Sequence, residues 1–172
     1  MKRLSALAFT ITLLLYLGAA LFARDAIAQS PKEQIVGAWT LVSADSVGPD
    51  GSRIQVFGSN PKGVMIFSRD GHFALVQMRA ELPTIAAKSR DQGTPEENKA
   101  IVQGSIAYFG TYSVNESDKS ITLKLEGSTF ANIVAAGEQK RIITSLTADE
   151  LRFTNPRTPA GATLEVSWKR AQ

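Results

Sequence analysis

Cysteine is absent from the 172-residue sequence. The chain therefore has no disulfide, no thiolate nucleophile, no zinc–thiolate site and no N-terminal cysteine to carry a lipid anchor. A domain of this length buries roughly 70% of the surface that its unfolded chain exposes, so it needs no covalent cross-link. The sequence thus predicts a domain that is held together by its hydrophobic core.

Histidine is nearly absent as well, because His72 is the single one in the sequence. One histidine excludes a histidine-rich metal site, and a Ser-His-Asp triad would have to be built on a turn. His72 follows Asp70-Gly71 directly, which favours a solvent-side turn position. We therefore assign no catalytic residue, no metal ligand and no cofactor from the sequence.

Neither sign of charge dominates the chain after its N-terminal segment. The full sequence has 19 basic and 16 acidic residues, but Lys2, Arg3 and Arg24 lie in residues 1–28 with only Asp25 on the acidic side. The remainder is close to neutral. A nucleic-acid-binding protein would instead show a basic face or stripe, so no nucleic-acid partner is expected.

Residues 1–28 have the pattern of a secretory signal peptide. A short basic start precedes an uncharged run rich in Leu and Ala, and Ala26-Ile27-Ala28 supplies a small-X-small cleavage site. We expect cleavage after Ala28, a periplasmic or secreted location and no stable membrane anchor afterwards. The alternative is an uncleaved anchor, because the apolar run approaches the length of a bilayer span.

Residues 29–172 are predicted to form one all-β domain with one helix in mid-chain. Short runs of alternating apolar and polar residues recur at roughly ten-residue spacing, which predicts about 8 to 10 strands in a sandwich or a closed barrel. "GTPEENKAIVQGSIAY" interrupts this pattern. Thr94, Pro95 and Glu97 match a capping box with proline at the first helical position, so we expect a helix over Pro95–Ala107.

The clearest local signal is "GVMIFSRDGHFALVQM", in which two strand-like runs flank Asp70-Gly71. This dipeptide suits a two-residue type I′ hairpin turn. Such a turn pairs Arg69 with His72 and places Met65 opposite Val76. Both faces of the hairpin are mostly apolar, so we expect one to line an interior and the other to be covered by the mid-chain helix or by residues 82–93.

The triplet Gly37-Ala38-Trp39 resembles the Gly-X-Trp signature of lipocalins. Together with "NPKGVMIFSRDGHFALVQMRA" and "AYFGTYSVNE", it makes most of the chain similar to the bacterial lipocalin-like domain family. The resemblance implies an antiparallel barrel in which Gly37 and Trp39 close one end. It also implies a covering cation, with Lys169, Arg170 or Arg141 as the candidates.

The family resemblance further implies that the barrel binds a small, largely apolar molecule. The residues expected to line the cavity are Met65, Phe67, Val76, Met78, Tyr112, Leu123 and Phe153. Two alternatives stay open. The barrel could be an enzyme of the isomerase, cyclase or hydratase type acting on an apolar substrate, or it could be filled by its own side chains and have a structural role. The sequence does not define the ligand or the oligomeric state.

Overall fold

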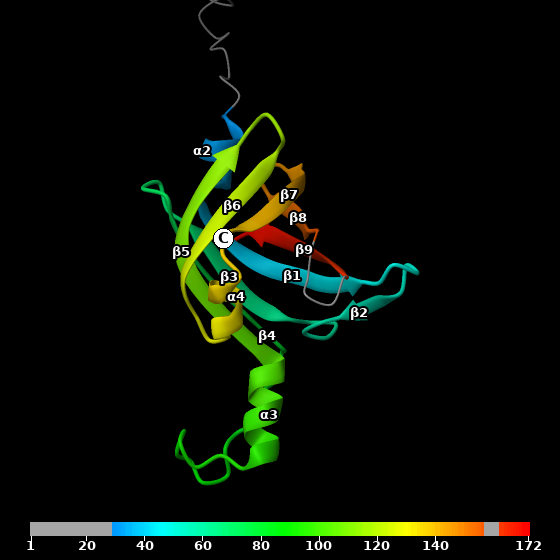
Figure 1. The fold of residues 1–172 in the computed structure, drawn as a ribbon, viewed down its shortest axis with the longest axis vertical. Coiled ribbons are helices and arrows are strands. Elements are labelled where there is room, and N and C mark those ends of the chain that lie inside the picture. Colours follow the sequence, from blue (N-terminus) through cyan, green and yellow to red (C-terminus); the bar gives the residue numbers. More distant parts are fainter. Residues whose placement is uncertain (1–28, 157–161) are drawn as a thin grey trace, which may run out of the picture.

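The computed structural model describes residues 29–156 and 162–172, and the predicted signal peptide lies outside them. These residues form nine strands and three short helices (Figure 1). The elements, in chain order, are α2 (Pro31–Ile35), β1 (Gly37–Val47), β2 (Arg53–Gln55), β3 (Lys62–Phe67), β4 (His72–Met78), α3 (Pro95–Gly104), β5 (Ser105–Asn115), β6 (Ser120–Ser128), α4 (Ala131–Ala135), β7 (Gln139–Leu146), β8 (Glu150–Asn155) and β9 (Thr163–Arg170).

The strands form a closed antiparallel barrel, as predicted. Neighbours in the sheet follow the order β2-β1-β3-β4-β5-β6-β7-β8-β9, and β1 also pairs with β9, which closes the ring. One edge of β1 is shared: Gly37–Thr40 pairs with β3, and Asp45–Val47 pairs with the extra strand β2. The barrel wall therefore consists of β1 and β3–β9, with β2 as a short addition at the far end of β1.

α3 begins where the sequence predicts it. Thr94 accepts a hydrogen bond from the Glu97 backbone N–H at 3.2 Å, and Glu97 accepts one from the Thr94 N–H at 2.9 Å, which completes the capping box. The helix ends at Gly104, three residues before the predicted Ala107, because Ser105–Ala107 already pair with β4. Figure 1 shows α3 extending away from the barrel, at the end opposite α2.

The β3–β4 hairpin differs from its prediction by one residue of register. Phe67 pairs with Phe73 and Met65 with Leu75, so the connection is a three-residue loop, Arg69–Gly71, and not a two-residue turn. Gly71 has φ +90°, and its N–H donates to Ser68 O at 3.2 Å. This pattern fits the common three-residue hairpin loop, in which a type I turn is followed by a left-handed glycine. A shift of one residue moves each side chain of β4 to the other face.

The core fills the inside of the barrel with apolar side chains from all eight wall strands. Trp39, Trp168, Phe67, Met65, Leu75, Ile121, Leu123 and Leu151 are each less than 2% exposed. Ring pairs join strands of the wall: Phe67 on β3 meets Tyr112 on β5 edge-on at 4.7 Å between centroids, and Phe73 on β4 meets Tyr108 on β5 at 6.0 Å. Large-to-small changes among these residues would leave cavities and cost several kcal/mol.

Candidate functional site

One end of the barrel is closed by a plug, which we define as Ile35, Trp39, Arg170 and the helix α2. Trp39 is fully buried, and its indole N–H donates to Ile35 O at 2.8 Å. The guanidinium of Arg170 lies 3.8 Å from the centroid of the Trp39 ring. Its N–H groups donate to Gln34 O, Val36 O and Ala148 O. The plug therefore ties the first strand, the last strand and α2 together.

The other residues proposed for the plug divide between the two faces of the wall. Gly37 has φ +124°, and a Cβ there would lie 2.9 Å from Arg170 Nη1, so a side chain would compete with the guanidinium. Lys169 is exposed on the outer face, because it precedes the inward Arg170 on the same strand. Arg141 is buried in the wall on β7 and does not cover Trp39.

Five of the seven residues predicted to bind ligand face the interior. Met65, Phe67, Leu123 and Phe153 are buried members of the core, and Tyr112 packs partly buried against them. The Tyr112 hydroxyl donates to Ser68 O at 2.8 Å, so its polar end is held by the β3–β4 turn at the plug end. Burial is the main cause that raises the pKa of the Tyr112 hydroxyl, followed by the nearby Asp70.

Val76 and Met78 do not belong to this interior set, because the register is shifted by one residue. On β4 the buried residues are Phe73, Leu75 and Gln77, and Val76 and Met78 alternate with them on the outer face. The sequence-based register had placed Gln77 outside and Val76 inside. In the observed register, the polar Gln77 therefore faces the interior where the apolar Val76 was expected.

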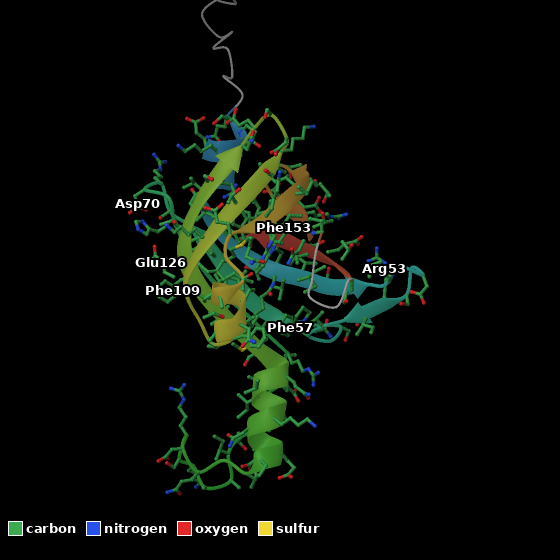
Figure 2. All side chains as sticks on the ribbon, in the orientation of Figure 1. Arg53, Phe57, Asp70, Phe109, Glu126 and Phe153 are labelled. Atoms are coloured by element: carbon green, nitrogen blue, oxygen red, sulfur yellow. The ribbon has the colours of Figure 1, made fainter. Side chains whose placement is uncertain are left out.

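The outer face of β3–β5 remains exposed and apolar. Val64, Ile66 and Phe109 are 39%, 46% and 53% exposed, and Ala74 and Val76 lie between them in register. Figure 2 shows Phe109 on this outer side. The prediction that α3 or residues 82–93 cover this face is wrong, since α3 projects past the end of the barrel (Figure 1).

Short segments close the end of the barrel opposite the plug. The Val56 N–H donates to Ala44 O at 2.9 Å, which brings Phe57 onto the core with 7% exposure. α4 follows the end of β6 and packs on that strand, and its Ile133 and Val134 contact the core while partly exposed. α4 has five residues, no side-chain hydrogen bond at its N-cap and no buried residue. Little therefore holds α4 in place.

Several buried side chains of the barrel wall carry polar groups. Arg141 on β7 is 3% exposed, Gln77 on β4 is 4% exposed, and Trp168 on β9 is fully buried. The indole N–H of Trp168 has no hydrogen-bond partner among the described residues. The hairpin register predicted from the sequence does not place Gln77 inside, and the family resemblance implies for Arg141 only a role as a cover for Trp39. In "QKRIITSL", alternation alone does not show which of the basic residues faces inward.

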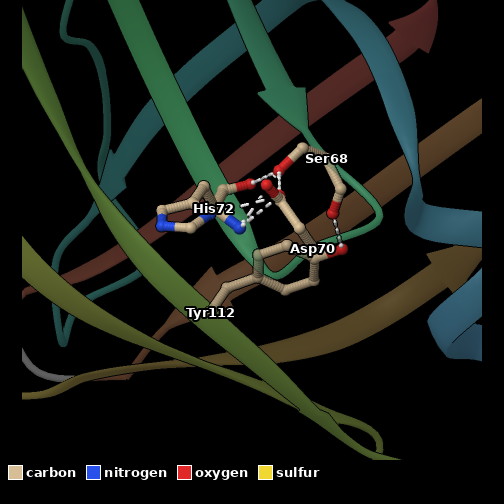
Figure 3. Close-up of polar contacts among 4 residues, drawn as sticks. All are labelled: Ser68, Asp70, His72 and Tyr112. Carbon is tan, nitrogen blue, oxygen red and sulfur yellow. Dashed lines mark hydrogen bonds and ion pairs between the residues drawn. The ribbon is translucent and has the colours of Figure 1, made fainter.

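His72, at the start of β4, is an exposed residue of the β3–β4 turn (Figure 3). Its Nδ1 lies 3.2 Å from Asp70 Oδ1, and the Ser68 hydroxyl hydrogen-bonds the same carboxylate. The Ser68 hydrogen bond is the largest cause that lowers the pKa of Asp70 to about 2, followed by His72. Because Asp70 stands between Ser68 and His72, the imidazole does not activate the hydroxyl as a triad would. The cluster organises the turn.

A concavity of about 770 Å³ lies on the outer face of β1 and β7–β9. Five of its seven charged side chains pair with one another: Arg53 contacts Glu165 at 2.6 Å and Asp45 at 3.7 Å, and Arg152 contacts Glu150 at 2.7 Å. Arg53 marks this side of the molecule in Figure 2. Because these exposed charges already have partners, the concavity does not require an ionic ligand.

Residues 29–156 and 162–172 contain neither a metal-type cluster nor a membrane-spanning helix. No group of three or more His, Asp or Glu side chains in this part of the chain has the arrangement of a metal site. No helix there has both the length and the apolar character needed to span a membrane.

The chain is similar to a known domain family and, more distantly, to solved structures. A structure of a lipocalin-like protein from Bacteroides uniformis is 16% identical, with a TM-score of 0.45, over 80% of this chain and 99% of that one. A de novo designed fluorescence-activating β-barrel is 11% identical, with a TM-score of 0.39, over 83% of this chain and 99% of that one. A search of the curated proteins found no match. The model of the lipocalin-like domain family matches residues 36–171, so the chain belongs to that family.

Proposed function

We propose that this protein binds a small, largely apolar molecule inside its barrel, at the end opposite the plug. One observation carries the proposal: the two ends of the barrel are closed in very different ways. At the plug end, Arg170 makes three hydrogen bonds to backbone carbonyls and covers Trp39. At the other end, α4 has no buried residue and no side-chain cap. A ligand that enters by displacing α4 would break few contacts.

The side chains at that end favour an apolar ligand. Ile133 and Val134 of α4 contact the core together with Val56, Ile106 and Leu164, and all five are partly exposed. Covering such residues with an apolar molecule removes their remaining surface from water, which contributes about 25 cal/mol for each Å². Small barrels of about eight strands have room for one small ligand or for packed side chains.

The binding test is a titration of the delipidated protein with an environment-sensitive apolar fluorophore. We expect saturable binding, and we expect Val134→Asp to weaken it about tenfold by placing a charge where apolar contact is needed. Asn132→Asp is the matched control, since it puts the same charge on an exposed position of α4. Equal affinities of the two variants would contradict entry at α4.

A second candidate is a barrel filled by its own side chains. It is favoured by the near-complete burial of Trp39, Trp168, Phe67 and Met65. No saturable binding of any apolar probe to the folded, delipidated protein would select this function over ligand binding.

We also propose that the protein works in the periplasm or outside the cell. The support is the signal-peptide pattern of residues 1–28, with its Ala26-Ile27-Ala28 cleavage site. N-terminal sequencing of protein from the periplasmic fraction should begin at Gln29. A sequence that begins at Met1, or recovery of the protein in salt-washed membranes, would contradict export with cleavage.

A further inference from the structure

We infer that the outer face of β3–β5 binds the same face of a second copy of this chain and forms a weak two-fold dimer. This inference is independent of the proposed ligand, because it concerns the outside of the barrel wall. We call the surface the sheet face. Its six residues form two rows across the three strands: Ile66, Ala74 and Phe109 in one row, and Val64, Val76 and Ala107 in the other.

The sheet face is a contiguous apolar surface. All six of its side chains are apolar, and Val64, Ile66, Ala74 and Phe109 are exposed. Single exposed apolar residues are common on soluble proteins, whereas a contiguous group on one face is typical of an interaction surface. The sheet face therefore indicates a binding partner.

Phe109 protrudes beside a hollow of the same face. A Cβ on Gly127 would lie 2.6 Å from Phe109 Cε1, so the ring lies across β6 above that glycine. The hollow has a volume of about 340 Å³ and is lined in part by Ala74, Val76 and Ala107. An apolar cavity of about 150 Å³ already holds a benzene ring, so the hollow accepts a phenyl side chain. One face thus carries both an aromatic side chain and a place for one.

A two-fold axis that runs across the strands, between the two rows, matches this shape. Such an axis exchanges the rows, because an isologous contact uses the same patch on both copies. Phe109 of each copy then meets the hollow at Ala107 of the other, and Ile66 meets Val64. One contact fills both hollows. A different partner would need an aromatic group and a hollow of its own at the same spacing, so the shape favours a second copy.

The charges around the sheet face agree with the same axis. Neither row contains a charged residue, so two copies bring no like charges together at the centre. Lys62 is exposed two residues before Val64 on β3, and Asp70 is exposed in the turn at the other end of that strand. The axis exchanges these two ends and places Lys62 of one copy beside Asp70 of the other. Rim pairs of this kind add little affinity but help to fix the register.

A membrane matches the surroundings of the sheet face less well. Anionic lipids attract a surface rich in Lys and Arg. Asp70 and Glu126 are instead exposed beside the sheet face, and Figure 2 shows both on the same side of the molecule as Phe109. Mixed charges at the rim favour a protein partner.

The size of the contact determines its expected strength. Strands lie about 4.8 Å apart and residues on one face recur about every 6.8 Å, so four strands and four rows span about 19 Å by about 27 Å. This is about 500 Å² on each copy and about 1,000 Å² in total, which is the lower limit of a specific interface. We therefore expect a dissociation constant of about 10 to 100 μM.

Sedimentation velocity of the purified protein from about 1 to about 500 μM tests the dimer without any variant. We expect monomer at the lowest concentration and mostly dimer at the highest. A monomer at every concentration would overturn the inference. Binding of that monomer to vesicles of phosphatidylcholine and phosphatidylglycerol would assign the sheet face to a membrane instead.

A charge on the sheet face tests its place in the contact. Ile66→Lys should weaken association at least about tenfold, because the dimer would bury an unpaired ammonium group. Val42→Lys is the matched control: Val42 is 48% exposed and Ile66 46%, but Val42 lines the separate concavity of β1 and β7–β9. It should associate like the wild type. Equal weakening by both variants would overturn the inference, because net charge would explain it.

Phe109→Ala is a second variant, which adds no charge and tests the contact should Ile66→Lys fail to fold. It empties both hollows, so it should also weaken association about tenfold. Unchanged association of folded Phe109→Ala would overturn the arrangement.

A mixture of two variants tests the exchange of the rows. Val64→Glu alone should weaken association, because each copy would bury a carboxylate against Ile66 of the other. In a mixture of Ile66→Lys protein with Val64→Glu protein, the axis places the new ammonium group opposite the new carboxylate. Mixed dimers should therefore form within about threefold of the wild-type affinity. A mixture that associates as weakly as its separate components would overturn the two-fold arrangement.

Discussion

Arg170 lies 3.8 Å above the ring of Trp39, and a Cβ on Gly37 would come within 2.9 Å of the same guanidinium. Strand β9 thus supplies the cation, Arg170. Strand β1 supplies both the Trp39 ring and, at Gly37, the space that the guanidinium occupies. Cation–π contacts of this kind contribute about 0.5 to 2 kcal/mol, and the carbonyl hydrogen bonds of Arg170 add to this. Several contacts of different kinds therefore stabilise the plug.

Trp39→Ala should lower the free energy of unfolding by about 3 to 5 kcal/mol, since a fully buried indole is replaced by a cavity. Chemical denaturation followed by circular dichroism measures this loss. An unchanged denaturation midpoint would mean that Trp39 does not pack as described.

Arg170→Met should cost about 2 to 4 kcal/mol, because it keeps the length of the side chain but removes the cation and its bonds to Gln34 O, Val36 O and Ala148 O. Lys169→Met is the matched control on the neighbouring, exposed position and should change stability by less than about 0.5 kcal/mol. Similar losses for both variants would show that the effect comes from net charge and not from the plug.

The register of the β3–β4 hairpin predicts opposite results for two apolar residues. Met65→Lys should unfold the protein, because it puts an unpaired charge at a position that is 1% exposed. Val76→Lys should be tolerated, because this side chain lies on the outer face and its ammonium group can reach water. Thermal melting of both variants is the measurement. The two-residue turn would instead make both variants unfold.

The Asp70 carboxyl should make stability depend on pH in the acid range. Its pKa is lowered from 3.8 to about 2, so its ionised form stabilises the folded state. That contribution is fully present above about pH 4 and is lost as the pH falls through about 2. Melting temperatures of wild type and Asp70→Asn should differ above this window and converge below it. A difference that persists at the lowest pH would assign the effect to something other than ionisation.

His72→Ala refines the same experiment. The hydrogen bond from Ser68 stays in place in this variant, and it is the largest cause of the lowered Asp70 pKa. The acid transition should therefore move to slightly higher pH without disappearing. Ligand binding should be unchanged, because His72 is more than half exposed at the plug end. If folded His72→Ala lost ligand binding, the site would lie at the plug end, which would contradict the proposed function.

The parts of the fold that the sequence predicts are those set by local chemistry. Thr94, Pro95 and Glu97 determine where α3 begins, and the alternation in "SITLKLEGS" identifies β6 with its inward Ile121, Leu123 and Leu125. The Asp70-Gly71 signal predicts the hairpin but not its register. Both two- and three-residue loops accept a glycine at that place, and apolar residues on both faces of the hairpin give no preference.

The candidate ligand site could be predicted only in part. Met65, Phe67, Leu123 and Phe153 follow from apolar patterning, because inward positions of a barrel are mostly apolar. Arg141 cannot be found in this way, since a basic residue in a strand usually faces solvent. Its inward orientation depends on the pairing of β6 with β7, where Ile121 lies opposite Arg141. That pairing forms only when the sheet assembles, so the local sequence of β7 does not reveal it.

The pairing of β1 with β9 also determines the order in which the molecule can fold. Gly37–Val47 and Thr163–Arg170 stand near opposite ends of the described chain, yet they share a ladder from Trp39–Arg170 to Val47–Thr163. Until β9 has joined the sheet, β1 and β8 are open edges, and Trp39 has no cation above it. Contacts between such distant segments slow folding, so ring closure is expected to be a late step. A chain truncated before Thr163 would be an open sheet that can pair with another copy of itself.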